Sequence, residues 1–262
     1  MIETLLLAAA RIVTYNGPQL LTNASGFFFE RDKRLFVVTS RHVMFDGPTN
    51  HCPNRIEIEL HLDADNMAKS TGYSIPLYQN GVRLWRQGID AAGEIDVAVI
   101  EIDRTALPET ALYCAFTPKH LYGPHAQIEV GSRLLIVGFP LGFHDTLHHM
   151  PVARRAIISS SFGLRFQGMG YFLTDARTHR GTSGSPVVTR VSDDAGHLGT
   201  LPWMLLGVHS ARLDVGTRDL ELDEALGLNI AWYADILMTL TAGDARIPMP
   251  EALRELPDTV DG

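Results

Sequence analysis

The sequence predicts an all-β protein made of two six-stranded antiparallel β-barrels with a short C-terminal helix. Short apolar runs separated by turn residues extend through most of the 262 residues. About six such runs lie on each side of a connector that contains proline and glycine. Closed barrels leave no sheet edge exposed, so two packed barrels accommodate this many short strands.

In the first half, the apolar run Leu5–Ala10 is expected to form an opening helix or strand. Residues 55–62 give the clearest strand pattern, because apolar and polar side chains alternate there. The polar stretch Arg31–Arg34 is expected to turn a hairpin between two apolar runs. The predicted strands of this half are 11–15, 26–30, 35–39, 55–62, 73–78, 82–86 and 96–102.

The strand pattern lapses over residues 108–124, which we interpret as a connector between the halves. We expect an N-terminal barrel over residues 1–117, a C-terminal barrel over 118–245, and a poorly ordered tail over 246–262. Apolar residues at helical spacing predict a closing helix over 231–241. The predicted strands of the second half are 133–138, 155–160, 171–175, 185–190, 203–209 and 226–230.

The composition bounds the partners and the cellular setting. A formal net charge of -8, with no run rich in lysine or arginine, argues against nucleic-acid and membrane-surface binding. The run Leu5–Ala10 lacks a basic segment before it and is too short to span a bilayer, so neither a secretion signal nor a membrane anchor is expected. Only two cysteines are present, Cys52 and Cys114, which favours a cytoplasmic location and leaves open whether they pair.

Three motifs can carry chemistry. Ser183 stands next to Gly184 and two residues after Gly181, just before an apolar run, which suits a nucleophile held on a tight turn. The serine motif alone is more often a turn between strands. His42 ends one apolar strand and Asp96 begins another, and each also has an ordinary structural explanation. The order His, Asp, Ser in an all-β chain with two halves indicates a catalytic triad.

These motifs resemble those of the trypsin/chymotrypsin-like serine peptidases, particularly the bacterial and viral branch with the glutamyl endopeptidases and the high-temperature-requirement proteases. The resemblance extends from about Ala10 to Leu240 and rests on Thr39–His42, Asp96–Val99 and Gly181–Pro186. It implies two chymotrypsin-like barrels and a bacterial enzyme that hydrolyses peptide bonds through an acyl-enzyme. No cofactor or metal is expected for this chemistry.

The resemblance assigns a role to each residue of the triad. Ser183 is the expected nucleophile, His42 the general base and then acid, and Asp96 the partner that fixes the histidine tautomer. The amides of Gly181 and Ser183 are expected to form the oxyanion hole. Thr182 occupies the position where the digestive branch has an aspartate that binds a new N-terminus, so that activation route is not expected. The α/β-hydrolases run Ser, Asp, His, which excludes them.

The same resemblance suggests a substrate pocket. Thr178 and His209 match positions that form the pocket for Glu or Gln in glutamyl endopeptidases and picornain-type proteases, and both can donate hydrogen bonds. Cleavage after Glu is therefore expected, with Gln second. Four further residues are pocket candidates. Three are cations that favour a carboxylate, Arg177, Arg180 and Arg212. The fourth is Ser210, which is expected to hydrogen-bond Asp96. The competing interpretation makes His209 a packed core residue and the arginines solvated.

Two alternatives complete the sequence interpretation. The polar residues His144, Asp145, His148 and His149 lack metal-site spacing and are expected to form a surface loop. A catalytically silent fold that serves as a peptide-binding or interaction module is the alternative function, because triad residues do not establish triad geometry. The expected partners are a protein or peptide substrate and a regulatory protein.

Overall fold

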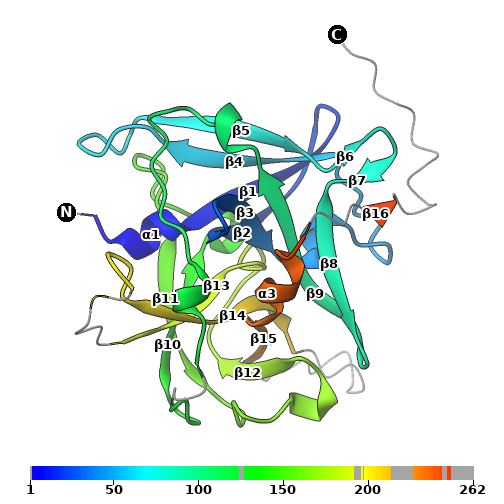
Figure 1. Cartoon of the computed structure of the whole chain (residues 1–262), viewed down its shortest axis with the longest axis vertical. Helices are drawn as coiled ribbons and strands as arrows, with labels where there is room; N and C mark the ends of the chain where they lie inside the picture. The colour runs from blue at the N-terminus through cyan, green and yellow to red at the C-terminus, as the bar shows by residue number, and fades with distance from the viewer. Residues whose placement is uncertain are drawn as a thin grey trace, which may run out of the picture.

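A seven-stranded sheet and a closed six-stranded barrel contain most of the strands in this protein. The computed structural model describes residues 2–123, 127–191, 196, 198–213, 227–243 and 247–248. Figure 1 shows the sheet above and the barrel below, with the short helix α3 (Ile236–Leu240) at the boundary between them. The all-β class expected from the sequence is confirmed.

The first half forms the seven-stranded antiparallel sheet, in the order β5-β4-β1-β2-β3-β9-β8. The apolar run at the N-terminus is both helix and strand, because α1 (Thr4–Ala8) leads directly into β1. The strands are β1 (Ala9–Asn16), β2 (Gln19–Arg31), β3 (Arg34–Thr39), β4 (Arg55–His61), β5 (Ser70–Pro76), β8 (Trp85–Asp90) and β9 (Gly93–Ile102). A small second sheet contains β6 (Tyr78–Gln79), β7 (Val82–Arg83) and β16 (Ile247–Pro248).

This half differs in detail from the six-stranded barrel that was expected. The sheet has seven strands, and β2 begins at Gln19 rather than at residue 26. Most of the extra segment is exposed or half-buried, so its sequence lacks the alternation of apolar and polar residues that predicts a strand. Pairing with β1 holds the segment in place. The predicted strand 82–86 divides between β7 and β8, with Leu84 outside both.

The second half forms the closed barrel, with strand order β10-β11-β12-β15-β14-β13. Its strands are β10 (Arg133–Gly138), β11 (Val152–Ile158), β12 (Tyr171–Asp175), β13 (Pro186–Arg190), β14 (Trp203–Arg212) and β15 (Leu228–Tyr233). The helix predicted over 231–241 is shorter than expected. Ala231 and Trp232 belong to β15, where they pair with Phe172 and Tyr171 of β12, so barrel closure overrides their helical spacing.

The segment between the halves passes from one to the other within a few residues. Phe116 bridges to Phe29 of the sheet, and Leu121 bridges to Leu205 of the barrel. The 3-10 turns of the chain are η1 (Arg104–Ala106), η2 (Pro118–His120), η3 (Pro140–Gly142) and η4 (Phe166–Gly168). The tail expected over 246–262 lies outside the described residues apart from Ile247 and Pro248.

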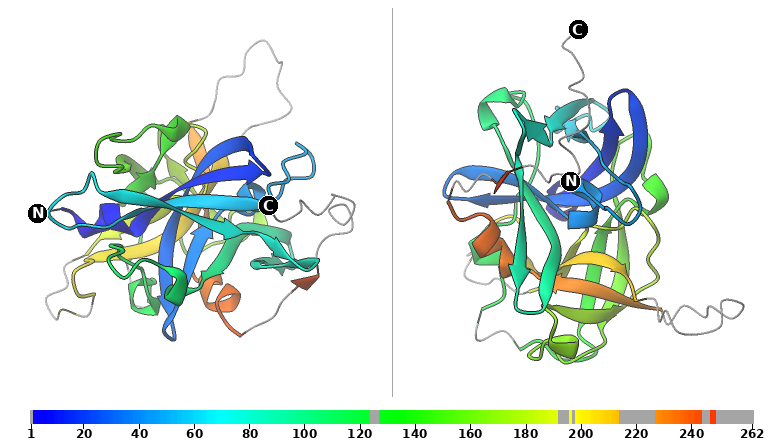
Figure 2. Two further views of the ribbon diagram at one scale, coloured as in Figure 1. Left: turned by 90° about the horizontal axis from the view of Figure 1, so that it is seen from above. Right: turned by 90° about the vertical axis from the view of Figure 1, so that its right-hand side faces the viewer.

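Each half also holds an end of the other. Thr4 of α1 donates to the carbonyl of Thr200 in the second half at 2.6 Å. At the other end of the chain, arginines of the sheet donate to carbonyls at the end of α3, Arg31 to Met238 at 2.5 Å and Arg86 to Leu240 at 3.2 Å. The two arginine contacts satisfy carbonyls that the end of α3 leaves unpaired. Figure 2 shows α3 against the sheet from two further directions.

Two further findings bear on the composition arguments. Cys52 and Cys114 are both free thiols, which answers the question of their pairing. In the ranges that the structure describes, no helix is long and apolar enough to cross a membrane.

The backbone of β2 is closely approached at Gly26. A β-carbon at this position would lie 2.7 Å from both Ile12 Cδ1 and the carbonyl oxygen of Val38. We predict that Gly26→Ala lowers the free energy of unfolding by about 1–3 kcal/mol, because backbone must shift to admit the methyl group. Gly72→Ala on β5 is the matched control, since a β-carbon there meets nothing within 4 Å. Equal urea midpoints for the two variants would contradict this prediction.

Candidate active site

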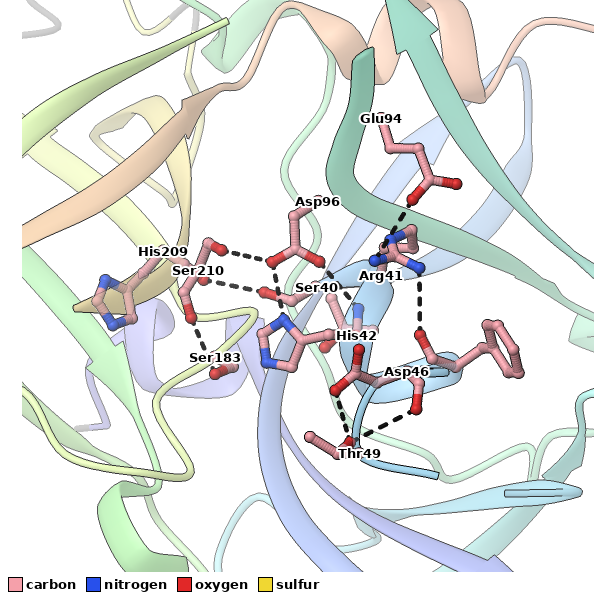
Figure 3. Close-up of polar contacts among 12 residues, drawn as sticks. Ser40, Arg41, His42, Asp46, Thr49, Glu94, Asp96, Ser183, His209 and Ser210 are labelled. Carbon is pink, nitrogen blue, oxygen red and sulfur yellow. Dashed lines mark hydrogen bonds and ion pairs between the residues drawn. The ribbon is translucent and has the colours of Figure 1, made fainter. Parts of the chain in front are cut away.

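His42 is held by a single helical turn that follows the end of β3. Ser40 precedes α2 (Arg41–Met44), which carries His42 against β9. Asp96 lies on β9 and accepts two hydrogen bonds from His42: its Oδ2 is 2.8 Å from the ring atom Nδ1, and its Oδ1 is 2.9 Å from the backbone amide. Figure 3 shows this pair beside Ser183. Two contacts to one carboxylate fix the imidazole orientation and leave Nε2 free to face the serine.

The pair shifts the pKa values of both groups. Burial opposes the charged imidazole, but the hydrogen bond and the charge of Asp96 outweigh it, so the pKa of His42 is raised. Burial likewise opposes ionisation of Asp96, but bonds from His42 and from the Ser210 hydroxyl keep the pKa of Asp96 lowered. The Ser210 contact fulfils the expectation from the sequence. His42 is thus paired with an ionised carboxylate, as a general base requires.

Ser183 stands on a tight turn between two glycines in the left-handed region. Gly181 has φ +89° and Gly184 has φ +86°. A β-carbon would lie 2.6 Å from the Phe139 carbonyl at Gly181, and 2.1 Å from the Ser25 carbonyl at Gly184. Both the backbone conformation and the available space therefore require glycine at these two positions.

The amides of this turn fall into two groups. Those of Thr182, Gly184 and Ser185 donate to the backbone carbonyls of His179, His209 and Thr182. Within the continuously described stretch 177–191, the amides of Gly181 and Ser183 donate to no protein group. Two unpaired N–H groups, separated by one residue and next to a serine hydroxyl, form an arrangement suited to binding an oxyanion.

Sequence analysis missed Ser25, which binds the serine turn from the other half of the molecule. Its amide donates to the Ser183 carbonyl at 3.0 Å, and its hydroxyl donates to the Gly181 carbonyl at 2.7 Å. The same hydroxyl accepts from the amide of Phe139 at 2.9 Å. Ser25 therefore fixes the carbonyls of the two residues whose amides are unpaired. A buried serine on a strand gave no signal in the sequence.

The Ser183 hydroxyl donates to the backbone carbonyl of Ser210 at 2.9 Å. Among the residues that the structure describes, no hydrogen bond joins Ser183 to His42. The three triad positions are together, as Figure 3 shows, but the hydroxyl is turned toward β14. Catalytic hydrogen bonds are often loose without substrate, and a side-chain rotation of Ser183 alone changes this one.

The expected pocket residues separate into different surroundings. Thr178 and His209 are both buried, and Thr178 Oγ1 bonds the side chain of Asn229, a residue that sequence analysis did not single out. Burial lowers the pKa of His209 to about 4, and its Nδ1 has no hydrogen-bond partner. In Figure 3 the His209 ring points away from His42.

The three arginines are not gathered around His209. Arg177 lines a cavity of about 590 Å³ together with Arg154, Arg155 and His179. Arg180 lines the cleft that also contains His42 and Ser183, and Arg212 is exposed near the end of β14. Neither of these two cavities is lined by Thr178 or His209.

An open cleft of about 810 Å³ begins at the triad and runs between the two halves. Ser183 and Gly181 line it from the barrel, and His42 lines it from the sheet. Its far wall consists of the exposed beginning of β2, where Leu20 is 52% exposed. Thr178, His209 and Asn229 do not line this cleft.

The histidine-rich segment forms a loop with its own contacts. His148 Nδ1 lies 2.7 Å from Asp145 Oδ2, and the rings of His144 and His149 stack with centroids 6.0 Å apart. His61 of β4 bonds the His148 carbonyl at 2.7 Å, which ties this barrel loop to the sheet. In the described part of the chain, no group of His, Cys, Asp or Glu is arranged to hold a metal ion.

Comparison with known proteins places this geometry in a family. A sequence model described as a trypsin-like peptidase domain matches residues 24–193, a range that includes His42, Asp96 and Ser183. No curated protein matches the sequence.

Among solved structures, the fold is similar to the crystal structure of the serine endoprotease from Yersinia pestis, with a TM-score of 0.50 and 18% sequence identity. That match covers 89% of this chain and 61% of the other chain. At this identity the similarity shows the fold alone. The sequence model, however, matches more than half of the chain, and the chain therefore belongs to the trypsin-like peptidase domain family.

Proposed function

We propose that this protein is a serine endopeptidase that cleaves peptide bonds through an acyl-enzyme formed on Ser183. The observation that carries the proposal is the placement of His42 between an ionised Asp96 and a serine whose turn presents two unpaired amides. Serine is a poor nucleophile, so this chemistry requires a base of suitable pKa beside it and an oxyanion site. A protein or peptide is the substrate.

The proposed reaction begins with rotation of the Ser183 hydroxyl from the Ser210 carbonyl to Nε2 of His42. Leaving one neutral hydrogen bond costs about 1 kcal/mol, which is small beside the catalytic barrier. Oγ then attacks the substrate carbonyl carbon while His42 takes the hydroxyl proton. The negative charge that develops on the carbonyl oxygen is stabilised by the amides of Gly181 and Ser183, each worth about 3 kcal/mol.

Collapse of this intermediate breaks the peptide C–N bond, and His42 returns the proton to the leaving amine. Water, deprotonated by His42, then hydrolyses the ester by the same steps in reverse. Throughout, Asp96 holds the imidazole in the tautomer whose Nε2 can accept a proton. The cleft of about 810 Å³ is lined by Ser183 but not by Thr178, and it is the proposed site of the leaving half of the substrate.

For the residue before the scissile bond, we propose a side chain that ends in a carboxyl or a carboxamide, Glu or Gln. Thr178 and His209 are the polar residues behind the serine turn in this proposal. Both are buried, and His209 Nδ1 has no partner, so a side chain that offers no polar group there would leave it unpaired.

We predict that a fluorophosphonate probe labels the wild-type protein and not Ser183→Ala. The variant should also lose about 10⁴-fold or more in kcat/KM on a casein-derived peptide mixture, because the nucleophile is absent. Ser161→Ala, which alters an exposed serine of the same half, is the matched control and should label normally. Absence of labelling in the folded wild type would favour the silent, peptide-binding alternative.

The raised pKa of His42 predicts a specific pH dependence. The base works only when neutral, so kcat/KM should rise with pH and reach half its maximum above 6.5, the ordinary histidine value. Asp96→Asn removes the charge that raises the pKa, so its residual activity, about 10⁴-fold lower, should reach half-maximum at a lower pH. An unchanged midpoint in this variant would show that Asp96 does not set the basicity of His42.

A peptide library randomised at the residue before the cleaved bond tests the pocket. Glu and Gln together should exceed every other residue by at least about tenfold in kcat/KM, because buried hydrogen-bonding groups discriminate strongly against unmatched side chains. Preference for Arg, Lys or a large apolar residue would refute the assignment of Thr178 and His209. Such a result would leave the triad chemistry untouched.

A further inference from the structure

Asn229 lies behind Thr178 with its side-chain amide held in one orientation. The residue is on β15 and is 0% exposed. Its Nδ2 donates to the backbone carbonyls of Thr174 at 3.3 Å, Ala176 at 2.7 Å and Gly227 at 3.2 Å. Carbonyl oxygens only accept hydrogen bonds, so these contacts place the NH₂ group and leave Oδ1 as an acceptor.

This orientation decides what Thr178 can offer to a ligand. Thr178 Oγ1 is 2.5 Å from Asn229 Oδ1, and since Oδ1 can only accept, the threonine hydroxyl is the donor. A hydroxyl carries a single proton. Beyond Asn229, therefore, Thr178 presents only lone pairs, and it is an acceptor rather than the donor expected from the sequence.

His209 provides the complementary group. It is 1% exposed, and burial lowers its pKa to about 4, so the ring is neutral at pH 7. A neutral imidazole has one N–H and one lone pair, and Nδ1 is buried without a partner. The charge of His42 further opposes protonation of this ring. Thr178 and His209 together thus offer an acceptor and a donor, with no positive charge.

This pair of groups matches a carboxamide better than a carboxylate. The NH₂ group of glutamine can donate to Thr178 while its oxygen accepts from His209. The carboxylate of glutamate has only acceptors, so one of its oxygens would face the lone pairs of Thr178. Of the three arginines, Arg177 lines a separate cavity, Arg180 lines the triad cleft, which includes neither Thr178 nor His209, and Arg212 is exposed. Burial of an uncompensated charge is strongly unfavourable.

We propose that Asn229, acting through Thr178, makes this enzyme select glutamine over glutamate before the scissile bond. The inference rests on the proposed function and reverses the order expected from the sequence, where Glu came first. Asn229 is a specificity-determining residue that touches no substrate atom. It sets the direction of one hydrogen bond.

The first test uses two fluorogenic peptides that are identical except for Gln or Glu before the cleaved bond. At pH 7.5 the wild type should cleave the Gln peptide with at least about tenfold higher kcat/KM. The kcat/KM of the Glu peptide should increase relative to that of the Gln peptide as pH falls. A carboxyl group, of ordinary pKa about 4.3, becomes a hydrogen-bond donor when it is protonated. The Glu-to-Gln ratio should rise about tenfold per pH unit from 7.5 to 5.5, and titration of His42 cancels in that ratio. A preference for Glu at pH 7.5, or a ratio that is constant with pH, would overturn the proposal.

Substitutions at Thr178 and Asn229 test whether these residues determine the preference for Gln over Glu. Thr178→Val keeps the shape and removes the hydroxyl, so the Gln-to-Glu ratio should fall toward one, whereas Thr178→Ser should keep the preference. Asn229→Ala frees the Thr178 proton for the substrate and should shift the ratio toward Glu. Because Asn229→Ala also removes a donor to the backbone carbonyls of Thr174, Ala176 and Gly227, its folding is checked by circular dichroism, and the two Thr178 variants decide the matter if it fails to fold. Unchanged ratios in Thr178→Val would overturn the proposal.

Probe labelling separates this inference from the proposed function. If the wild type labels at Ser183 but cleaves neither peptide, the pocket assignment is wrong and the serine chemistry stands. If the folded wild type does not label, the proposed function fails and this inference fails with it.

Discussion

The contacts of Ser25 with the serine turn are the interaction on which the rest of the site depends. Ser25 belongs to the sheet, whereas Gly181 and Ser183 belong to the barrel half, so one residue sets the position of each half against the other. By binding the carbonyls of these two residues, it holds the serine turn against the sheet. His42 and Asp96 come from the same sheet as Ser25. Together with the bond from Ser210 to Asp96, the contacts of Ser25 bring His42, Asp96 and Ser183 to one place.

Several buried hydrogen bonds near the site can have only one donor and one acceptor assignment. Ser210 donates its hydroxyl to Asp96 while its carbonyl accepts from Ser183, and Thr178 donates to Asn229. In each case, the partner's chemistry leaves only one direction for the proton. A list of polar residues around a site does not give this information. The direction of each bond has to be traced from groups that can only donate or only accept.

The sequence was sufficient to single out the three residues of the proposed triad and to predict most strands, because those signals are local. His42, Asp96 and Ser183 lie in short motifs, and the alternation in residues 55–62 predicts β4 directly. Ser25 and Asn229 could not be found in this way, since their partners lie up to 156 residues away in the chain. The helical spacing around Trp232 was misleading because closure of the barrel, a tertiary constraint, places that residue in a strand. The bond from Thr178 to Asn229 likewise joins residues 51 positions apart in the chain.

The two ends of the described chain are exchanged between its halves. Thr4 precedes the sheet yet bonds the barrel half, and α3 follows the barrel yet is capped by arginines of the sheet. Each half therefore loses contacts with a terminal segment when it is separated from the other half. The protein is best regarded as one cooperative folding unit with two sheets, and dissection at the connector would yield fragments that need each other to fold.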